Sequence, residues 1–207
     1  MDLHSFITII AIGIASNLDN AGVGIAYGVR KIYISHFSNF MIAIISFTGT
    51  LISGYFGNWI SHWVPHFVGN VIGAIVMISV GVWVLWQPFI GKKERKSEPV
   101  EVKKKNFITD LLRRPEEADF DQSKSLGVFE SIVLGIALSI NALAGGLDAG
   151  LTKINVLYTS ISVGIFSFLL LGLSCYLGDK FGAEKLKGKA TLISGLLLIF
   201  IGFRQMI

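Results

Sequence analysis

Charged residues are scarce in this chain. They make up 15% of the sequence, whereas hydrophobic residues make up 52% and the mean hydropathy is +0.64. A water-soluble domain usually carries about 25% charged residues. Cysteine is almost absent too, because Cys175 stands alone and therefore has no partner for an intrachain disulfide. This composition argues against a soluble domain and favours a membrane protein.

The sequence also lacks the motifs of ATP-driven proteins and of the common enzyme classes. It contains no Walker A loop, no nucleophile triad and no CxxC pair. We therefore expect neither an enzyme nor a resident cofactor. The formal net charge of +4 does not predict a nucleic-acid partner, because the basic residues lie beside apolar segments. A membrane surface explains them better.

What the chain does contain is long apolar runs. A helix needs about 20 apolar residues to cross a bilayer, and an isolated segment can satisfy its backbone in lipid only as a helix. Six segments meet this requirement. We expect an all-α membrane protein whose transmembrane helices cover residues 5–27, 38–60, 67–90, 128–150, 157–178 and 190–207.

The basic residues predict how these helices are oriented. All 18 lysines and arginines except Lys153 and Arg204 fall on one side if both termini lie outside the cell. The positive-inside rule therefore favours an N-out, C-out topology. Three helices per half then form two inverted repeats. The predicted units are a first repeat at 1–90, a basic cytoplasmic linker at 91–127 and a second repeat at 128–207.

A duplicated motif supports these repeats. Residues 11–32 align without gaps with residues 133–154, and Asp19 then corresponds to Asn141. The two copies lie in the first and fourth apolar segments, at membrane depth. Seven aligned pairs are identical: Gly13/Gly135, Ile14/Ile136, Ala15/Ala137, Gly24/Gly146, Gly28/Gly150, Lys31/Lys153 and Ile32/Ile154.

The polar residues of these copies predict a cation site. A carboxylate near the bilayer centre costs roughly 2.5–3.5 kcal/mol and needs a partner. Asp, Asn and Ser oxygens suit Mn²⁺, Mg²⁺ or Ca²⁺. The alternative is a structural hydrogen-bond network that locks the two helices together. The candidate ligands are Asp19, Asn141, Asn20, Asn17, Ser16 and Ser139, with Asp148 as a candidate for an exit path.

The stretches SNLDNAGVGIAYG and LGIALSINALAGG resemble the paired signatures of the MntP-like manganese efflux family. They most resemble its YtaF branch, which is named for a sporulation membrane protein. The resemblance implies a bacterial plasma-membrane cation exporter with Asp19 and Asn141 facing the ion. The chain departs from the family pattern where Asn141 replaces an aspartate, and where the second segment lacks an acidic residue. Both departures lower the charge of the site.

The linker carries a second pattern. Residues 119–130, DFDQSKSLGVFE, match the ligand spacing of a calcium-binding EF-hand loop. Lys124 stands where that loop normally has glycine. The alternative is an ordinary polar linker. The candidate Ca²⁺ ligands are Asp119, Asp121, Ser123, the Ser125 carbonyl and Glu130.

Three functions follow from these patterns. The first is a secondary transporter that exports a divalent cation such as Mn²⁺. The second is a sporulation membrane protein that does not transport, and the third is a calcium-responsive regulator acting through the 119–130 loop. The expected partners are the lipid bilayer and a divalent metal ion, with a homodimer as one candidate assembly.

Overall fold

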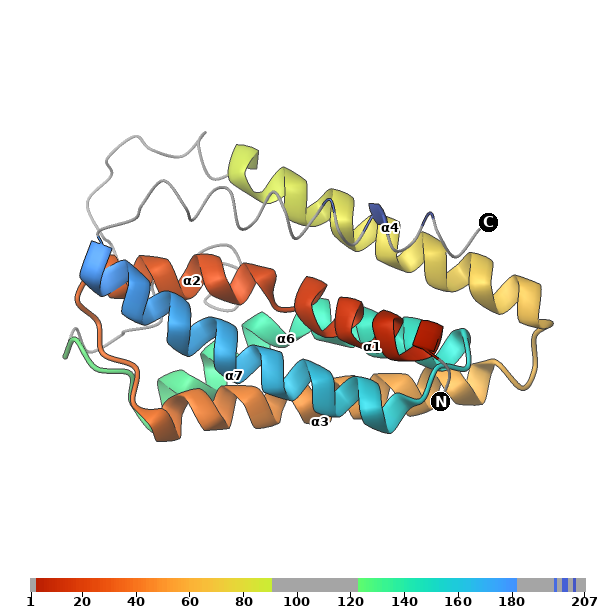
Figure 1. Cartoon of the computed structure of the whole chain (residues 1–207), viewed down its shortest axis with the longest axis horizontal. Coiled ribbons are helices and arrows are strands. Elements are labelled where there is room, and N and C mark those ends of the chain that lie inside the picture. The colour runs from red at the N-terminus through yellow and green to blue at the C-terminus, as the bar shows by residue number, and fades with distance from the viewer. Residues whose placement is uncertain (1–2, 91–122, 182–195, 197–198, 201–202, 204–207) are drawn as a thin grey trace, which may run out of the picture.

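The computed structural model describes residues 3–90 and 123–181, together with residues 196, 199–200 and 203. Its helices lie along one long axis as a bundle (Figure 1). Before the linker, α1 (Leu3–Ala15) and α2 (Leu18–Val29) follow each other closely, and α3 (His36–Ile60) and α4 (His66–Ile90) come next. After the linker come α6 (Val128–Leu151) and α7 (Val156–Phe181).

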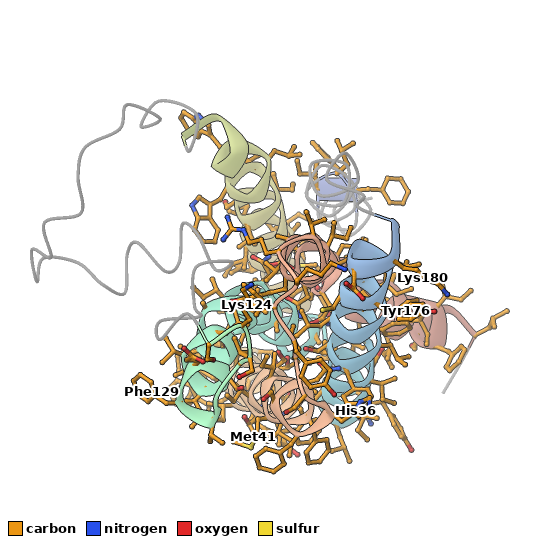
Figure 2. All side chains as sticks on the ribbon, turned by 90° about the vertical axis from the view of Figure 1, so that its left-hand side faces the viewer. His36, Met41, Lys124, Phe129, Tyr176 and Lys180 are labelled. Atoms are coloured by element: carbon orange, nitrogen blue, oxygen red, sulfur yellow. The ribbon has the colours of Figure 1, made fainter. Side chains whose placement is uncertain are left out.

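The bundle has the inside-out polarity of a membrane protein. Four helical stretches are long and apolar enough to cross a bilayer: Ser5–Val29, His36–Ile60, Val128–Leu151 and Val156–Lys180, and Phe67–Trp83 is a shorter apolar helix. Large apolar side chains point outward, as Phe129 does in Figure 2, while many buried side chains are Ser, Asn or Thr. This is a multi-pass helical membrane protein. The predicted sixth span at 190–207 lies mostly outside the described residues.

The predicted first span is two helices rather than one. The chain leaves the helix at Ser16 and Asn17 and enters α2 at Leu18. The Asn17 backbone N–H donates to the Ile14 carbonyl at 3.1 Å. The Gly13 carbonyl instead accepts a hydrogen bond from Nδ2 of the Asn17 side chain at 2.8 Å. A side chain that competes with the backbone in this way interrupts a helix.

Close backbone packing joins α2 to α7 and α6 to α3. Gly28 of α2 lies so close to α7 that a Cβ there would collide with the Cys175 carbonyl. Its repeat counterpart Gly150 is packed in the same way, and a Cβ there would collide with the Gly54 carbonyl of α3. Small residues allow membrane helices to approach at such distances. The contact made by one copy of the duplicated motif is thus made again by the other copy.

The two copies also end their helices alike. Lys31 and Lys153 both adopt a left-handed backbone, with φ of 60° and 59°. The next residue reaches back five positions in both copies, since Ile32 N–H donates to the Tyr27 carbonyl at 3.0 Å and Ile154 N–H to the Ala149 carbonyl at 2.9 Å. This is the Schellman ending of a helix, which usually has glycine at the left-handed position.

The end of the linker is fixed to the α2–α3 connection. Tyr33 N–H donates to the Lys124 carbonyl at 2.8 Å, and Leu126 N–H donates to the Tyr33 carbonyl at 3.0 Å. The Ser38 hydroxyl adds a bond to the Leu126 carbonyl at 2.8 Å. This short parallel bridge brings residues from two distant parts of the sequence together at one end of the bundle.

Candidate cation-binding site

The duplicated polar positions meet in the middle of the bundle. Asn141, near the centre of α6, donates from Nδ2 to Oδ2 of Asp19 at 2.8 Å. Asp19 lies in the first turn of α2, directly after the helix break. Two residues that correspond in the repeat therefore touch each other. A pair of this kind lies where the two copies face one another.

A chain of polar side chains continues from this pair towards α3 and α7. Asn20 donates from Nδ2 to Oδ1 of Asn17 at 2.9 Å and to Oγ of Ser167 at 3.2 Å. The Ser167 hydroxyl donates to Oγ of Ser46 at 3.3 Å. Asn17 also donates to the Val163 carbonyl of α7 at 3.1 Å. These bonds hold the broken segment against α7 and fix the orientation of its amides.

Four oxygens around this chain accept no hydrogen bond within the described part of the molecule. They are Oδ1 of Asp19, Oδ1 of Asn141, Oδ1 of Asn20 and Oγ of Ser16, and all four atoms are buried. Leaving a buried acceptor unpaired costs about 1–3 kcal/mol, and more for a charged group. Asp19 as a residue is half-buried, but this carboxylate oxygen has no access to solvent within the protein. The fold thus retains several unsatisfied oxygens beside one negative charge.

Oxygens of this kind can bind a hard cation. Carboxylate, amide and hydroxyl oxygens are the donors preferred by Mn²⁺, Mg²⁺ and Ca²⁺. Within residues 3–90 and 123–181, no group of three His, Cys, Asp or Glu side chains could hold a metal. A cation here would therefore depend on Asp19 together with neutral oxygens.

Two predicted ligands lie apart from this cluster. The Ser139 hydroxyl donates to the Ile136 carbonyl of its own helix at 2.8 Å, and its Cβ lies on the side of α6 that faces Gly49 of α3. Asp148 lies two turns beyond Asn141 and is fully buried. Packing within the described residues covers Asp148, and its place on an exit path stays a prediction.

The predicted calcium loop falls only partly within the described residues. Asp119 and Asp121 lie outside them. Lys124 has the left-handed φ of 60° that the glycine of an EF-hand loop would adopt. Glu130 uses Oε2 to accept from the Gly127 backbone N–H at 2.7 Å, which caps α6. The Ser123 hydroxyl donates to the Ser125 carbonyl at 2.9 Å. Calcium binding here stays a prediction.

Sequence reasoning missed Ser46 and Ser167. Each precedes a phenylalanine in the helix that directly follows its copy of the motif, in the stretches ISF and FSF. A serine in an apolar helix usually bonds to its own backbone, so neither residue stood out. The repeated Ser-Phe pair was the available signal. In the fold the two hydroxyls contact each other across the α3–α7 interface.

The fold and this cluster define a multi-pass membrane protein with a buried oxygen-rich site between duplicated helices. Comparison with known proteins identifies the group. The chain belongs to the MntP family, whose model is described as "Putative manganese efflux pump" and matches residues 104–206. This is a family of transporters rather than enzymes.

Individual relatives agree with this assignment. The protein named "Probable sporulation protein YtaF" of Bacillus subtilis is 31% identical over 203 residues, covering 95% of this chain and 97% of that protein. A "Putative manganese efflux pump MntP" of Campylobacter hominis is 37% identical over 83 residues, 40% of this chain and 45% of the relative. One from Clostridium perfringens is 33% identical over 114 residues, 55% and 53% of the two chains. No solved structure matches the chain.

Proposed function

We propose that this protein is a secondary transporter that exports a divalent cation such as Mn²⁺ from a bacterial cell. The observation that carries the proposal is the Asp19–Asn141 pair with its unsatisfied buried oxygens, located where a membrane helix is broken. A carboxylate at this depth is stabilised by an ion that visits it. The family description supports manganese as the substrate.

The mechanism follows from the charges and the break. Asp19 supplies the negative charge, and Asn141, Asn20 and Ser16 supply neutral oxygens. Broken helices at the bilayer midplane are common at the ion sites of transporters, because the free helix ends present unpaired carbonyls and N–H groups. A divalent ion with one carboxylate keeps a net positive charge. Moving one such charge across 100 mV changes the free energy by about 2.3 kcal/mol, so the membrane potential affects transport.

The transporter architecture belongs to the same proposal. Two inverted three-helix repeats, at 1–90 and 128–207, would face each other around the site, with both termini outside and the 91–127 linker in the cytoplasm. The recurrence of the Gly28 contact at Gly150 and of the Lys31 helix ending at Lys153 supports the repeats. The basic residues support the orientation. Cysteines introduced into the linker would react with an impermeant reagent only from the cytoplasmic side.

Transport in proteoliposomes tests the function. We expect Mn²⁺ flux from the wild type, measured against Mg²⁺ and Ca²⁺. Asp19→Asn should abolish the flux, since the amide keeps the shape but removes the charge. Asp179→Asn is the control, because Asp179 forms an exposed ion pair with Lys31 at 3.0 Å, away from the pair. Equal flux from Asp19→Asn and the wild type would exclude this site.

A second function is a sporulation membrane protein that keeps the fold without transport. The relative that spans nearly the whole chain carries a sporulation name, and Asn141 leaves the site with one carboxylate. A spore-forming strain separates the two functions. A strain that lacks the protein should then have a spore defect but normal manganese resistance. Restoration of sporulation by the Asp19→Asn variant to the same extent as by the wild type would favour this second function.

A further inference from the structure

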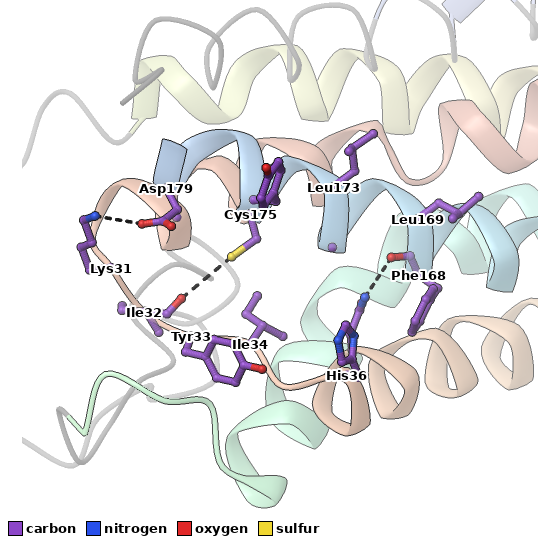
Figure 3. Close-up of a pocket in the computed structure, with 14 residues that line it drawn as sticks. Lys31, Ile32, Tyr33, Ile34, His36, Phe168, Leu169, Leu173, Cys175 and Asp179 are labelled. Atoms are coloured by element: carbon purple, nitrogen blue, oxygen red, sulfur yellow. Dashed lines mark hydrogen bonds and ion pairs between the residues drawn. The ribbon is translucent and has the colours of Figure 1, made fainter. Parts of the chain in front are cut away.

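A cavity of about 660 Å³ lies apart from the cation site, at the end of the bundle where α2 joins α3 (Figure 3). Its volume falls in the range of about 300–1,000 Å³ typical of small-molecule sites. One wall is α7 and the opposite wall is the α2–α3 connection with the start of α3. By the proposed topology this end is cytoplasmic.

The cavity is apolar along its length. Leu169 and Leu173 of α7 line it and are more than half exposed, at 51% and 59%. Phe168 and Ile34 extend the apolar lining (Figure 3). Exposed leucines on a membrane helix face lipid, so the cavity is open towards the acyl chains of the bilayer. Asn39 also lines it, and its buried Oδ1 accepts no hydrogen bond from the described residues.

The mouth of the cavity is basic. Lys31 lines it, and the Lys180 ammonium donates to the hydroxyl of the lining residue Tyr176 at 2.8 Å. Lys180 and Lys124 both lie at the end of the bundle that faces the viewer in Figure 2. The lining carboxylate Asp179 pairs with Lys31 at 3.0 Å, so Lys180 supplies the net positive charge of these three side chains.

That ion pair does not close the mouth. Both of its side chains are exposed, at 72% and 54%, and exposed pairs contribute little to stability. The Glu130 carboxylate is buried, accepts from the Gly127 backbone at 2.7 Å and does not line the cavity. The described mouth therefore favours an anion.

We propose that this cavity binds one anionic phospholipid, with its phosphate beside Lys31 and Lys180 and an acyl chain along Leu169 and Leu173. The basic mouth at the water interface and the apolar groove towards the bilayer match the two ends of such a molecule. The binding depends on the cavity alone, and the assignment to the inner leaflet rests on the proposed topology.

A native thiol in the cavity can report whether a lipid occupies it. Cys175 is the only cysteine and lines the cavity. We expect phosphatidylglycerol nanodiscs to slow the modification of Cys175 by a charged thiol reagent several-fold relative to phosphatidylcholine nanodiscs. Equal rates in the two lipids would overturn the proposal and indicate a water-filled cavity. Protection by millimolar inorganic phosphate in phosphatidylcholine would also overturn it, since it would indicate an anion site without a lipid.

Native mass spectrometry of the full-length protein in detergent with added phosphatidylglycerol measures binding directly. Lys31→Gln should weaken binding about five-fold, which corresponds to about 1 kcal/mol for one basic residue at an anionic lipid surface. Lys153→Gln is a matched control, because Lys153 is the repeat counterpart with the same backbone and lies at the other end of the bundle. Equal losses from both variants would refute a specific site.

A second pair of variants tests the acyl-chain groove. Leu173→Trp should fill the groove and displace the lipid, whereas Leu157→Trp on the same helix should not. The two leucines are similarly exposed, at 59% and 47%, but Leu157 lies near the opposite end of α7. Both changes place an aromatic residue on a lipid-facing surface, so folding should survive. Unchanged lipid binding by Leu173→Trp would contradict the proposal. Loss of lipid binding with intact Mn²⁺ transport would leave the proposed function standing.

Discussion

Asp19 and Asn141 are in contact and correspond in the repeat, so their side chains can be exchanged as a test of the site. Exchanging their side chains, with Asp19→Asn and Asn141→Asp together, leaves one carboxylate and one amide in the same contact. We expect the exchanged protein to bind Mn²⁺ nearly as the wild type does. Asp19→Asn alone removes the charge and should abolish the Mn²⁺ response.

The Asn141→Asp variant alone allows the expected change in stability to be estimated. It places two carboxylates in the contact that now measures 2.8 Å between Asn141 Nδ2 and Asp19 Oδ2. Two like charges about 4 Å apart repel by about 4 kcal/mol at an effective dielectric constant of about 20. A proton or a divalent cation between them removes the repulsion. Without metal the variant should therefore be less stable than the wild type, and Mn²⁺ should stabilise it more than it stabilises the wild type.

Thermal unfolding in detergent, with and without Mn²⁺, measures all four proteins of this cycle. For a protein of this size about 1 kcal/mol shifts Tm by about 2–4 °C, so the metal-dependent difference for Asn141→Asp is measurable. Mg²⁺ and a monovalent salt at equal ionic strength are the controls. The reasoning is refuted if the exchanged protein behaves like Asp19→Asn, or if Asn141→Asp leaves the Mn²⁺ response unchanged.

Three further predictions concern the framework of the site and the candidate calcium loop. Gly28→Ala should destabilise the protein by about 1–3 kcal/mol, because a Cβ would collide with the backbone of α7. Gly49→Ala is the control and should change Tm little, since its Cβ would meet its nearest atom at 3.4 Å. Equal shifts in Tm from the two variants would argue against the close approach of α2 to α7. Asn17→Ala removes the bonds to the Gly13 and Val163 carbonyls and should cost about 1–3 kcal/mol in thermal unfolding; an unchanged Tm would show that the break does not depend on this side chain. Calorimetric titration of the full-length protein should detect Ca²⁺ binding that Asp119→Ala abolishes, and the absence of binding heat in the wild type would exclude a calcium loop.

The apolar runs and the duplicated motif allowed much of the fold to be predicted. Helices at 38–60, 67–90, 128–150 and 157–178 were predicted to within a few residues, because apolar runs of this length have one stable form in lipid. The alignment of Asp19 with Asn141 singled out two residues that lie in contact. Repeats that pack against each other bring corresponding positions together, so the sequence carried this information.

The break at Ser16 and Asn17 could not be predicted in the same way. The apolar segment is long enough to be read as one helix despite the polar residues Ser16 and Asn17. The stability of the break depends on the Val163 carbonyl of α7, whose position only the fold provides. Ser139 was a reasonable candidate by spacing, but its hydroxyl bonds to its own helix. Small hydroxyl side chains have this local option at every helical position, and the sequence does not show which option is taken.

The packing of α2 against α7 has a consequence for biosynthesis. The glycine face of α2 is completed by residues such as Cys175, which the ribosome adds only after nearly all of the chain has been made. α3 waits in the same way for α6. α2 and α3 must therefore remain in the bilayer with these packing surfaces uncovered, shielded by lipid or by the insertion machinery, until α7 and α6 have been made. A chain that stops before residue 156 has α6 but lacks α7, so it would expose the α2 packing surface and become a substrate for membrane proteases.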